Sequence, residues 1–190
     1  MVIGGIAVIA RGVRRMTTDV DAVVRGDAIE IAPLLRFLAR HSIVPRIAAA
    51  ETFARANLVL LLRHKPSDVE LDVSFGWTMF EHEALDARSV TLYGKVAVPM
   101  ASAEDLVIMK AMAARPTDIT DAAELLALYP SIDLSRVRRT LGQLAEMAGE
   151  PALADGLADI LALVPKPASR RAKRPRTVSK KRPTKKPRRT

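Results

Sequence analysis

Two aspartates separated by one apolar residue, Asp19 and Asp21, are the residues of this chain best suited to chemistry. Successive side chains on a β-strand point to opposite faces, so both carboxylates would lie on the same face. Neighbouring carboxylates raise each other's pKa unless a cation lies between them. Hard oxygen ligands suit Mg²⁺ or Mn²⁺, so the pair predicts a divalent-metal site. The alternative, a pair of solvated strand residues, is disfavoured because they flank Val20 in a sequence that reads as buried.

A glycine pair, Gly4 and Gly5, precedes the aspartates and predicts a tight turn after a first strand within residues 1–8. Without a Cβ, the backbone N–H groups of such a turn can approach phosphate oxygens closely. An ordinary strand-to-helix turn would need the same glycines. Their phosphate role therefore depends on the aspartates.

A third carboxylate, Asp72, lies in a segment whose apolar and polar residues alternate over 69–75. This period of two predicts a strand with Leu71 and Val73 on one face and Asp72 on the other. Two interpretations are open. Asp72 is either a polar residue on the wet face of a half-exposed strand or a third member of the metal site.

Lys110 falls on the apolar stripe of a predicted helix, together with Leu106 and Met109. A lysine on an apolar face is costly to desolvate unless its stem reaches water or its amine meets an anion. An active-site phosphate or carboxylate would be such an anion. Lys110 is therefore a candidate functional residue.

Composition excludes several kinds of site and of protein. The chain has no cysteine, which rules out disulfides, thiolate metal sites and cysteine nucleophiles. Its three histidines, His41, His64 and His82, show no ligand spacing. No apolar run approaches the roughly 18–20 residues that span a bilayer, and no signal peptide opens the chain. We therefore expect a cytoplasmic protein with no membrane partner.

The positive charge of the chain is concentrated at its C-terminus. Residues 166–190 hold 13 of the 30 Lys and Arg and no acid, which leaves 17 basic against 21 acidic residues, a net charge of −4, in residues 1–165. A Lys/Arg/Pro-rich segment of this kind cannot bury a core, so residues 165–190 are predicted to form a disordered tail. Such a tail either binds nucleic acid non-specifically through its phosphates or only keeps the protein soluble.

Hydrophobic periodicity and turn signals divide the rest of the chain into two parts. Residues 1–100 read as strands and short helices, including a helix over 6–13, and predict a mixed sheet with flanking helices. Residues 101–164 read as a helical C-terminal part, with helices over 134–148 and 151–163. The predicted fold class is therefore α+β.

The order and spacing of these residues resemble the signature of the nucleotidyltransferase superfamily. Val2-Ile3-Gly4-Gly5 is followed by Arg15, Thr17 and the Asp19-Val20-Asp21 strand. More closely, the chain resembles the AbiEii-type minimal nucleotidyltransferases, some of which are toxins of type IV toxin–antitoxin systems. The segments 102–110 and 114–121 resemble the second and third blocks of that family. Thr117 stands where the family usually has lysine.

The resemblance implies a nucleotidyltransferase (polymerase-beta-like) fold and an enzyme that moves a nucleoside monophosphate from an NTP to an acceptor. Asp19, Asp21 and Asp72 would hold Mg²⁺ or Mn²⁺ in a two-metal type of phosphoryl transfer, with Lys110 as a further catalytic residue. Nucleotide binding would fall to four residues: Gly4, Gly5, Arg15 and Thr17. The acceptor would be nucleic acid, with tRNA as a candidate, or protein, and a cognate antitoxin would be a partner. Arg15 could equally be a loop cation that neutralises Asp19.

A second hypothesis is a non-catalytic protein of the same fold that binds nucleotide or a partner. Thr117 favours it, as does the start of the chain inside the first strand, where relatives usually carry a preceding helix. A third hypothesis places the function in the basic tail, as a nucleic-acid-binding protein.

Overall fold

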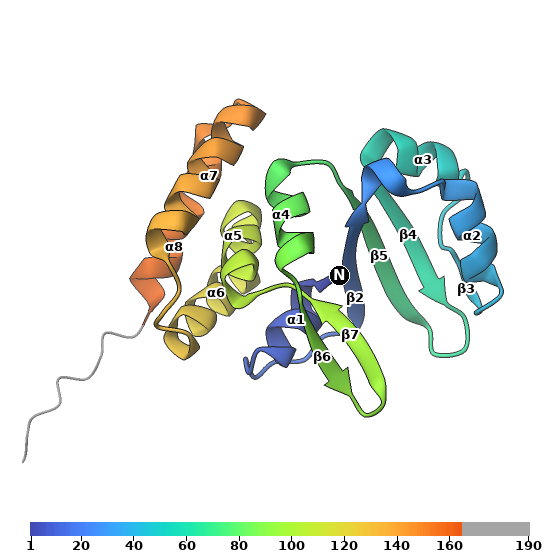
Figure 1. Cartoon of the computed structure of the whole chain (residues 1–190), viewed down its shortest axis with the longest axis horizontal. Helices are drawn as coiled ribbons and strands as arrows, with labels where there is room; N and C mark the ends of the chain where they lie inside the picture. The colour runs from blue at the N-terminus through green and yellow to red at the C-terminus, as the bar shows by residue number, and fades with distance from the viewer. Residues whose placement is uncertain (165–190) are drawn as a thin grey trace, which may run out of the picture.

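The computed structural model describes residues 1–164 of the 190-residue chain. The predicted disordered tail, residues 165–190, lies outside the described residues. Within residues 1–164, strands and helices form an α+β fold, which confirms the predicted class (Figure 1).

One seven-stranded mixed sheet runs through the molecule in the order β3-β4-β5-β2-β1-β7-β6. β2 pairs with β5 in parallel, β1 pairs with β7 in parallel, and the other neighbours are antiparallel. The strands are β1 Val2–Ile3, β2 Asp19–Arg25, β3 Ile43–Pro45, β4 Val59–His64, β5 Val69–Gly76, β6 Ser89–Tyr93 and β7 Val96–Met100.

Helices flank the sheet and form most of the second half of the described chain (Figure 1). The α-helices are α1 Gly4–Ala10, α2 Ile31–Ala39, α3 Ala50–Asn57, α4 Met79–Ala87, α5 Ala103–Ala113, α6 Pro116–Leu128, α7 Leu134–Ala148 and α8 Gly156–Leu163. Two short 3₁₀ helices are η1 Gly26–Ala28 and η2 Pro151–Ala154. None of the helices within residues 1–164 has both the length and the apolarity of a membrane span.

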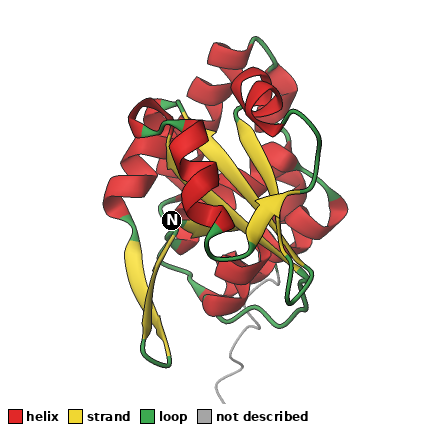
Figure 2. Cartoon of the chain, turned by 90° about the vertical axis from the view of Figure 1, so that its right-hand side faces the viewer, coloured by secondary structure: helices red, strands yellow, loops and turns green. Residues whose placement is uncertain are grey.

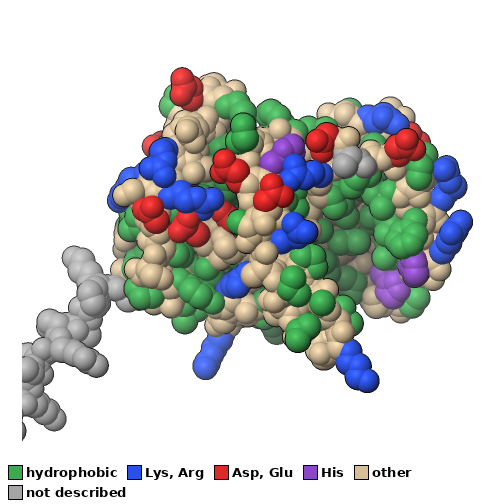
Figure 3. Space-filling view, in the orientation of Figure 1, with side chains coloured by type: hydrophobic (Ala, Val, Ile, Leu, Met, Phe, Trp, Pro, Cys, Tyr) green, Lys and Arg blue, Asp and Glu red, His purple; other side chains and the backbone are tan. Residues whose placement is uncertain are grey.

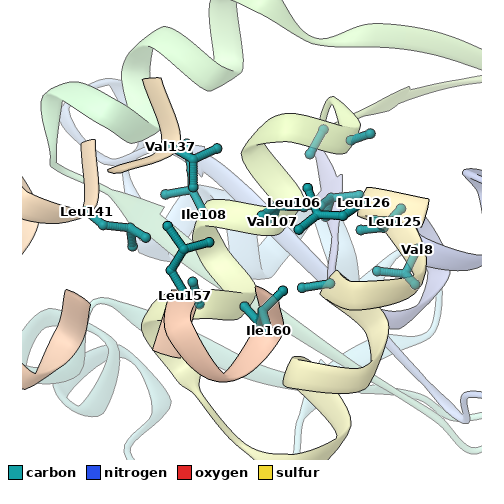
Figure 4. Packing of buried hydrophobic residues seen from close by; sticks show 14 of the residues in the cluster. Val8, Leu106, Val107, Ile108, Leu125, Leu126, Val137, Leu141, Leu157 and Ile160 are labelled. Carbon is teal, nitrogen blue, oxygen red and sulfur yellow. The ribbon is translucent and has the colours of Figure 1, made fainter. Parts of the chain in front are cut away.

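Two hydrophobic cores lie on the two sides of the sheet. The smaller core packs α2 and α3 against Leu60, Leu62, Val73 and Phe75 of β4 and β5. The larger core joins α1 and α4 to the helices of the C-terminal half; its labelled members include Val8, Leu106 and Ile160 (Figure 4). Because Val73 faces the smaller core, its neighbour Asp72 points to the opposite face.

The capping residues explain where two of these helices begin and end. Ser102 accepts a hydrogen bond from the Asp105 backbone N–H and caps α5. Asp133 caps α7, and Gly149 ends it in the left-handed conformation, so the helix predicted over 134–148 is confirmed.

Two predicted helix boundaries are wrong. The first helix begins at Gly4 and ends at Ala10, so the glycines form its first turn and do not precede it. The helix predicted over 151–163 is divided into η2 and α8. Asp155 separates the two, and α8 begins at Gly156, where its backbone lies directly against the Ala111 carbonyl of α5.

The strands β6 and β7 project from the body as a hairpin, with β6 at the open edge of the sheet (Figure 2). Val90, Leu92 and Val96 are exposed on it, and hydrophobic side chains are visible on this hairpin at the lower edge of the space-filling view (Figure 3). In the sheet, β1 alone separates this hairpin from β2.

Gly156 provides a test of the helical packing. A Cβ at this position would collide with the Ala111 backbone, so Gly156→Ala should lower the free energy of unfolding by about 2 kcal/mol. Gly142→Ala in the exposed interior of α7 meets no atom and should raise it by up to about 1 kcal/mol. Urea unfolding followed by circular dichroism measures both. Equal effects of the two substitutions would contradict the close packing of α8 on α5.

Candidate functional site

The register of β2 against β5 brings the predicted acidic residues together. Asp21 lies directly beside Asp72, and Asp19 lies beside Glu70. The strands are parallel and the side chains alternate, so these four residues share one face of the sheet. This face is opposite to the one covered by α2 and α3.

Asp19, Asp21, Glu70 and Asp72 together form the carboxylate row. Gly4 allows the turn between β1 and α1 to contact this row. Ile3 pairs with Asp21 across the sheet, and Gly4 follows it with a φ of +60°, in the left-handed region. A Cβ on Gly4 would overlap the Asp21 carboxylate. Glycine is therefore required here both by the backbone conformation and by the close approach of an acid.

Gly5 makes room for the loop that leads into β2. A Cβ on Gly5 would lie 2.6 Å from Oγ1 of Thr17 and 3.0 Å from Nη2 of Arg15. The Thr17 hydroxyl in turn donates a short hydrogen bond to the Asp19 carboxylate. The glycine pair thus packs against Asp21 itself and against Thr17, which bonds Asp19, and this is more than a generic strand-to-helix turn requires.

Burial and crowding work against the negative charge of this row. Burial raises the pKa of Asp21, and the carboxylates of Asp19 and Asp72 raise it further, against a smaller lowering by Lys110 and Arg115. Burial also raises the pKa of Asp72, although Arg46 partly lowers it. A cation between these groups would remove the repulsion.

Arg46 already supplies one such cation, and sequence reasoning missed it. Its guanidinium pairs with Glu70 and also donates from Nη2 to Oδ1 of Asp72 at 2.5 Å. Glu70 receives a second arginine, Arg63, at 3.0 Å. The acids at 70 and 72 indicate that cations lie nearby, but only the strand register identifies Arg46.

The donor set suits a hard divalent cation. Asp19 and Asp21 provide carboxylate oxygens on one face, beside a turn that has no Cβ to fill the space. Within residues 1–164, no three His, Cys, Asp or Glu side chains meet closely enough to form a complete metal site. Asp72, the third predicted ligand, is held by Arg46.

Lys110 is buried beside the row, in an ion cluster that joins α5 and α6. The residue is 7% exposed, and Nζ lies 2.6 Å from Oδ1 of Asp118 and 3.0 Å from Oδ2 of Asp121. Arg15 pairs with Asp121 at 2.6 Å, and Arg115 with Asp118 at 2.5 Å. The anions that the sequence requires for Lys110 are thus carboxylates of the third motif block.

The ion cluster shows where Arg15 and the acids of the third motif block lie. Arg15 pairs with Asp121, and no salt bridge joins it to Asp19 within residues 1–164. Asp118 and Asp121 are 1% and 4% exposed, which is not expected of acids that only complement a helix dipole at the surface. Arg115 is the N-cap residue of α6 and Pro116 its first residue, so Thr117 lies inside the helix and does not cap it.

An apolar pocket of about 500 Å³ continues along the same sheet face. Val23 and Ser74 are the next pair in the row after Asp21 and Asp72, and both line it. Its walls are formed by Met109 and Met112 of α5, by Leu144 and Met147 of α7, and by Trp77, which precedes α4. Sequence reasoning missed this pocket because its walls are far apart in the chain.

Comparison with known proteins gives one family. Residues 1–150 match the model of a family described as nucleotidyltransferase of unknown function (DUF6036). The match supports the superfamily predicted from the glycine and aspartate motifs, whereas the AbiEii-type likeness stays a prediction. No curated protein matches the chain.

Two aspartates should respond oppositely to loss of their charge. The Asp21 charge is opposed by burial and by Asp19 and Asp72, so Asp21→Asn should raise the stability of the metal-free protein by up to about 1 kcal/mol. Asp118 is paired with Lys110 and Arg115, so Asp118→Asn leaves buried charge unpaired and should cost about 3 kcal/mol. Thermal unfolding at pH 7 with EDTA measures both. A loss of stability in Asp21→Asn would show that its charge is not repelled.

The contribution of Asp118 to the stability of the fold should depend on pH. Burial opposes ionisation of Asp118, but hydrogen bonds from Arg115 and Lys110 prevail and lower its pKa below the ordinary value of 3.8. A carboxyl with a lowered pKa stabilises the fold above its ordinary pKa, and this contribution is lost as the pH falls through the lowered value. The stability gap between wild type and Asp118→Asn should therefore close below pH 3.8. Urea unfolding from pH 7 to pH 3 tests this, and a constant gap would contradict the ionised pairing.

Proposed function

The chain belongs to the family of nucleotidyltransferases of unknown function (DUF6036), and from its carboxylate row we propose a metal-dependent transfer of a nucleoside monophosphate from an NTP to an acceptor. The observation that carries the proposal is the pairing of Asp21 with Asp72 beside the Cβ-free turn at Gly4. Crowded carboxylates on one face, of which Asp21 and Asp72 are partly buried, suit a cation and its phosphate ligands. They have no evident use as a purely structural feature, because their own repulsion destabilises the fold.

Asp19 and Asp21 would hold the divalent ion, with Asp72 as the third oxygen ligand. When bound, the ion would neutralise the phosphates and favour the ionised form of the attacking hydroxyl. Thr17 orients Asp19 through its hydroxyl hydrogen bond. Gly4, which has no Cβ, leaves the space beside the Asp21 carboxylate free.

In the proposed reaction the acceptor hydroxyl oxygen bonds to the α-phosphorus, and the bond to the bridging oxygen of pyrophosphate breaks. The proton of the hydroxyl would pass to Asp72, whose carboxylate lies directly beside Asp21. Pyrophosphate leaves with the electron pair of the broken bond.

The ion cluster between α5 and α6 would face the triphosphate. Arg115 is held by Asp118, yet its side chain is 72% exposed, and its charge is close enough to lower the pKa of Asp21. Such a guanidinium suits phosphate oxygens. Thr117 stands where AbiEii-type sequences usually have lysine, and Arg115 would supply positive charge on this side instead. One argument for a non-catalytic protein is thereby weakened.

The apolar pocket would receive the nucleoside. Two residues along a strand span about 6.6 Å, so Val23 and Ser74 begin the pocket one such step beyond Asp21 and Asp72. A nucleotide whose α-phosphate lies at the carboxylates would extend its sugar and base into this space. The walls are mainly apolar, and three polar residues, Ser74, Thr78 and Glu81, line the pocket, which suits stacking more than selective hydrogen bonding.

The acceptor and the biological role follow only from the AbiEii-type resemblance. We propose RNA, with tRNA as the first candidate, or protein as the acceptor, in a toxin–antitoxin or phage-defence setting with a cognate antitoxin. Thirteen Lys and Arg within residues 166–190, outside the described residues, would assist an RNA acceptor through its phosphates.

Transfer of label from α-³²P NTPs tests the activity. Each NTP is incubated separately with the full chain, Mg²⁺ or Mn²⁺, and total tRNA or cell protein. Label should enter one acceptor class, and Asp21→Asn should reduce the rate by at least about 100-fold, because it removes a ligand of the reacting phosphate's cation.

Asp68→Asn is the matched control, because Asp68 is an exposed acid at the turn into β5 that pairs with Arg63. It should leave the rate unchanged. Binding of NTP without any transfer would favour the non-catalytic hypothesis, and label that persists in Asp21→Asn would remove the carboxylate row from the reaction.

A further inference from the structure

Arg46 has a place on the carboxylate face that the proposed reaction does not yet use. Pro45 of β3 pairs with Leu62 of β4, and the Arg46 backbone N–H donates to the Leu61 carbonyl at 3.1 Å. Leu61 pairs with Asp72, and Asp72 with Asp21. Arg46 directly follows β3 and therefore lies at one end of a line of neighbours that crosses β4 and β5 and ends at Asp21 in β2.

The contacts of Arg46 differ from those of an ordinary surface ion pair. Its side chain is only 18% exposed, and its two terminal nitrogens bind two carboxylates of one strand, Glu70 and Asp72. Glu70 has a second partner in Arg63. Within residues 1–164, Arg46 is the one cation in direct contact with Asp72.

This contact has a consequence for metal binding. An arginine that occupies a carboxylate oxygen both uses a ligand and places a positive charge where a second divalent ion would bind. Asp19 and Asp21, by contrast, are not joined to any arginine or lysine by a salt bridge in the described part of the chain. The row is thus divided into a pair open to a cation and a third carboxylate that already has one.

We propose that Arg46 sets the metal stoichiometry of the free protein, so that one divalent ion binds at Asp19 and Asp21 while Asp72 is withheld from a second. This inference rests on the proposed function. The phosphates of a bound nucleotide offer Arg46 another anion that fits its planar fork, and transfer of Arg46 to them would release Asp72. Arg46 is in this sense a positioning residue that couples nucleotide binding to completion of the metal site.

Binding of Mn²⁺ to the full chain without nucleotide tests the proposal. Free Mn²⁺ is followed by electron paramagnetic resonance at constant pH and salt. Wild type should bind one ion per chain, whereas Arg46→Gln should bind two, or bind the second at least about tenfold more tightly. Arg46→Lys retains the charge and should resemble wild type.

Arg63→Gln is the matched control, since Arg63 also pairs with Glu70 but does not contact Asp72. It should bind one ion. If Arg63→Gln also bound a second ion, the cause would be the loss of any nearby positive charge and not the Arg46–Asp72 contact, and the proposal would fail. Two ions bound by wild type, or one ion bound by Arg46→Gln, would also overturn the proposal. Circular dichroism melts establish that each variant is folded.

The outcomes distinguish this inference from the proposed function. NTP transfer together with an unchanged stoichiometry in Arg46→Gln would reject only the role of Arg46. No Mn²⁺ bound by wild type, together with no transfer, would reject both. If Asp21→Asn eliminates the ion of wild type, the first ion is located at Asp19 and Asp21.

Discussion

The parallel, in-register pairing of β2 with β5 is the constraint on which the rest of the site depends. A slip of one residue would turn Asp72 towards the smaller core and bring Val73 onto the carboxylate face. Burial of Val73 and Phe75 against α2 and α3 therefore fixes the register through the opposite face of the sheet. The core on one side of the sheet determines the chemistry on the other, and the pocket that follows at Val23 and Ser74 depends on the same register.

Charge is balanced differently in the two halves of the site. Asp118 and Asp121 are buried with close cationic partners, so they stabilise the packing of α5 on α6. Asp21 is partly buried without a direct cationic partner, and its pKa is raised. A fold that keeps such a residue tolerates local instability, which a ligand can relieve. This contrast separates the residues that build the site from those proposed to act in it.

Period-two alternation was sufficient to place the aspartates on one face, and the apolar stripe around Lys110 was sufficient to demand an anion. These inferences succeed because each depends on a local repeat. Arg46 could not be found in this way, because its contact with Asp72 depends on two antiparallel registers and on the short connection from β3 to α3. The carboxylate partners of Lys110 likewise depend on how α6 packs against α5. The first helix was misplaced because its glycines serve a tertiary contact with Asp21 and Thr17, which outweighs their low helix propensity.

The helical part of the chain is a component of the site, although sequence patterning separates residues 101–164 from the sheet. Lys110 and Arg115 both lower the pKa of Asp21, and Met109 and Met112 form one wall of the pocket whose floor is β2 and β5. A sheet without these helices would present its carboxylates without the cations that oppose their repulsion. The family match over residues 1–150 includes both parts, as expected if the acidic face and the cationic helices form one functional unit. Nucleotide would then bind between them, with its phosphates exposed to acids on one side and to bases on the other.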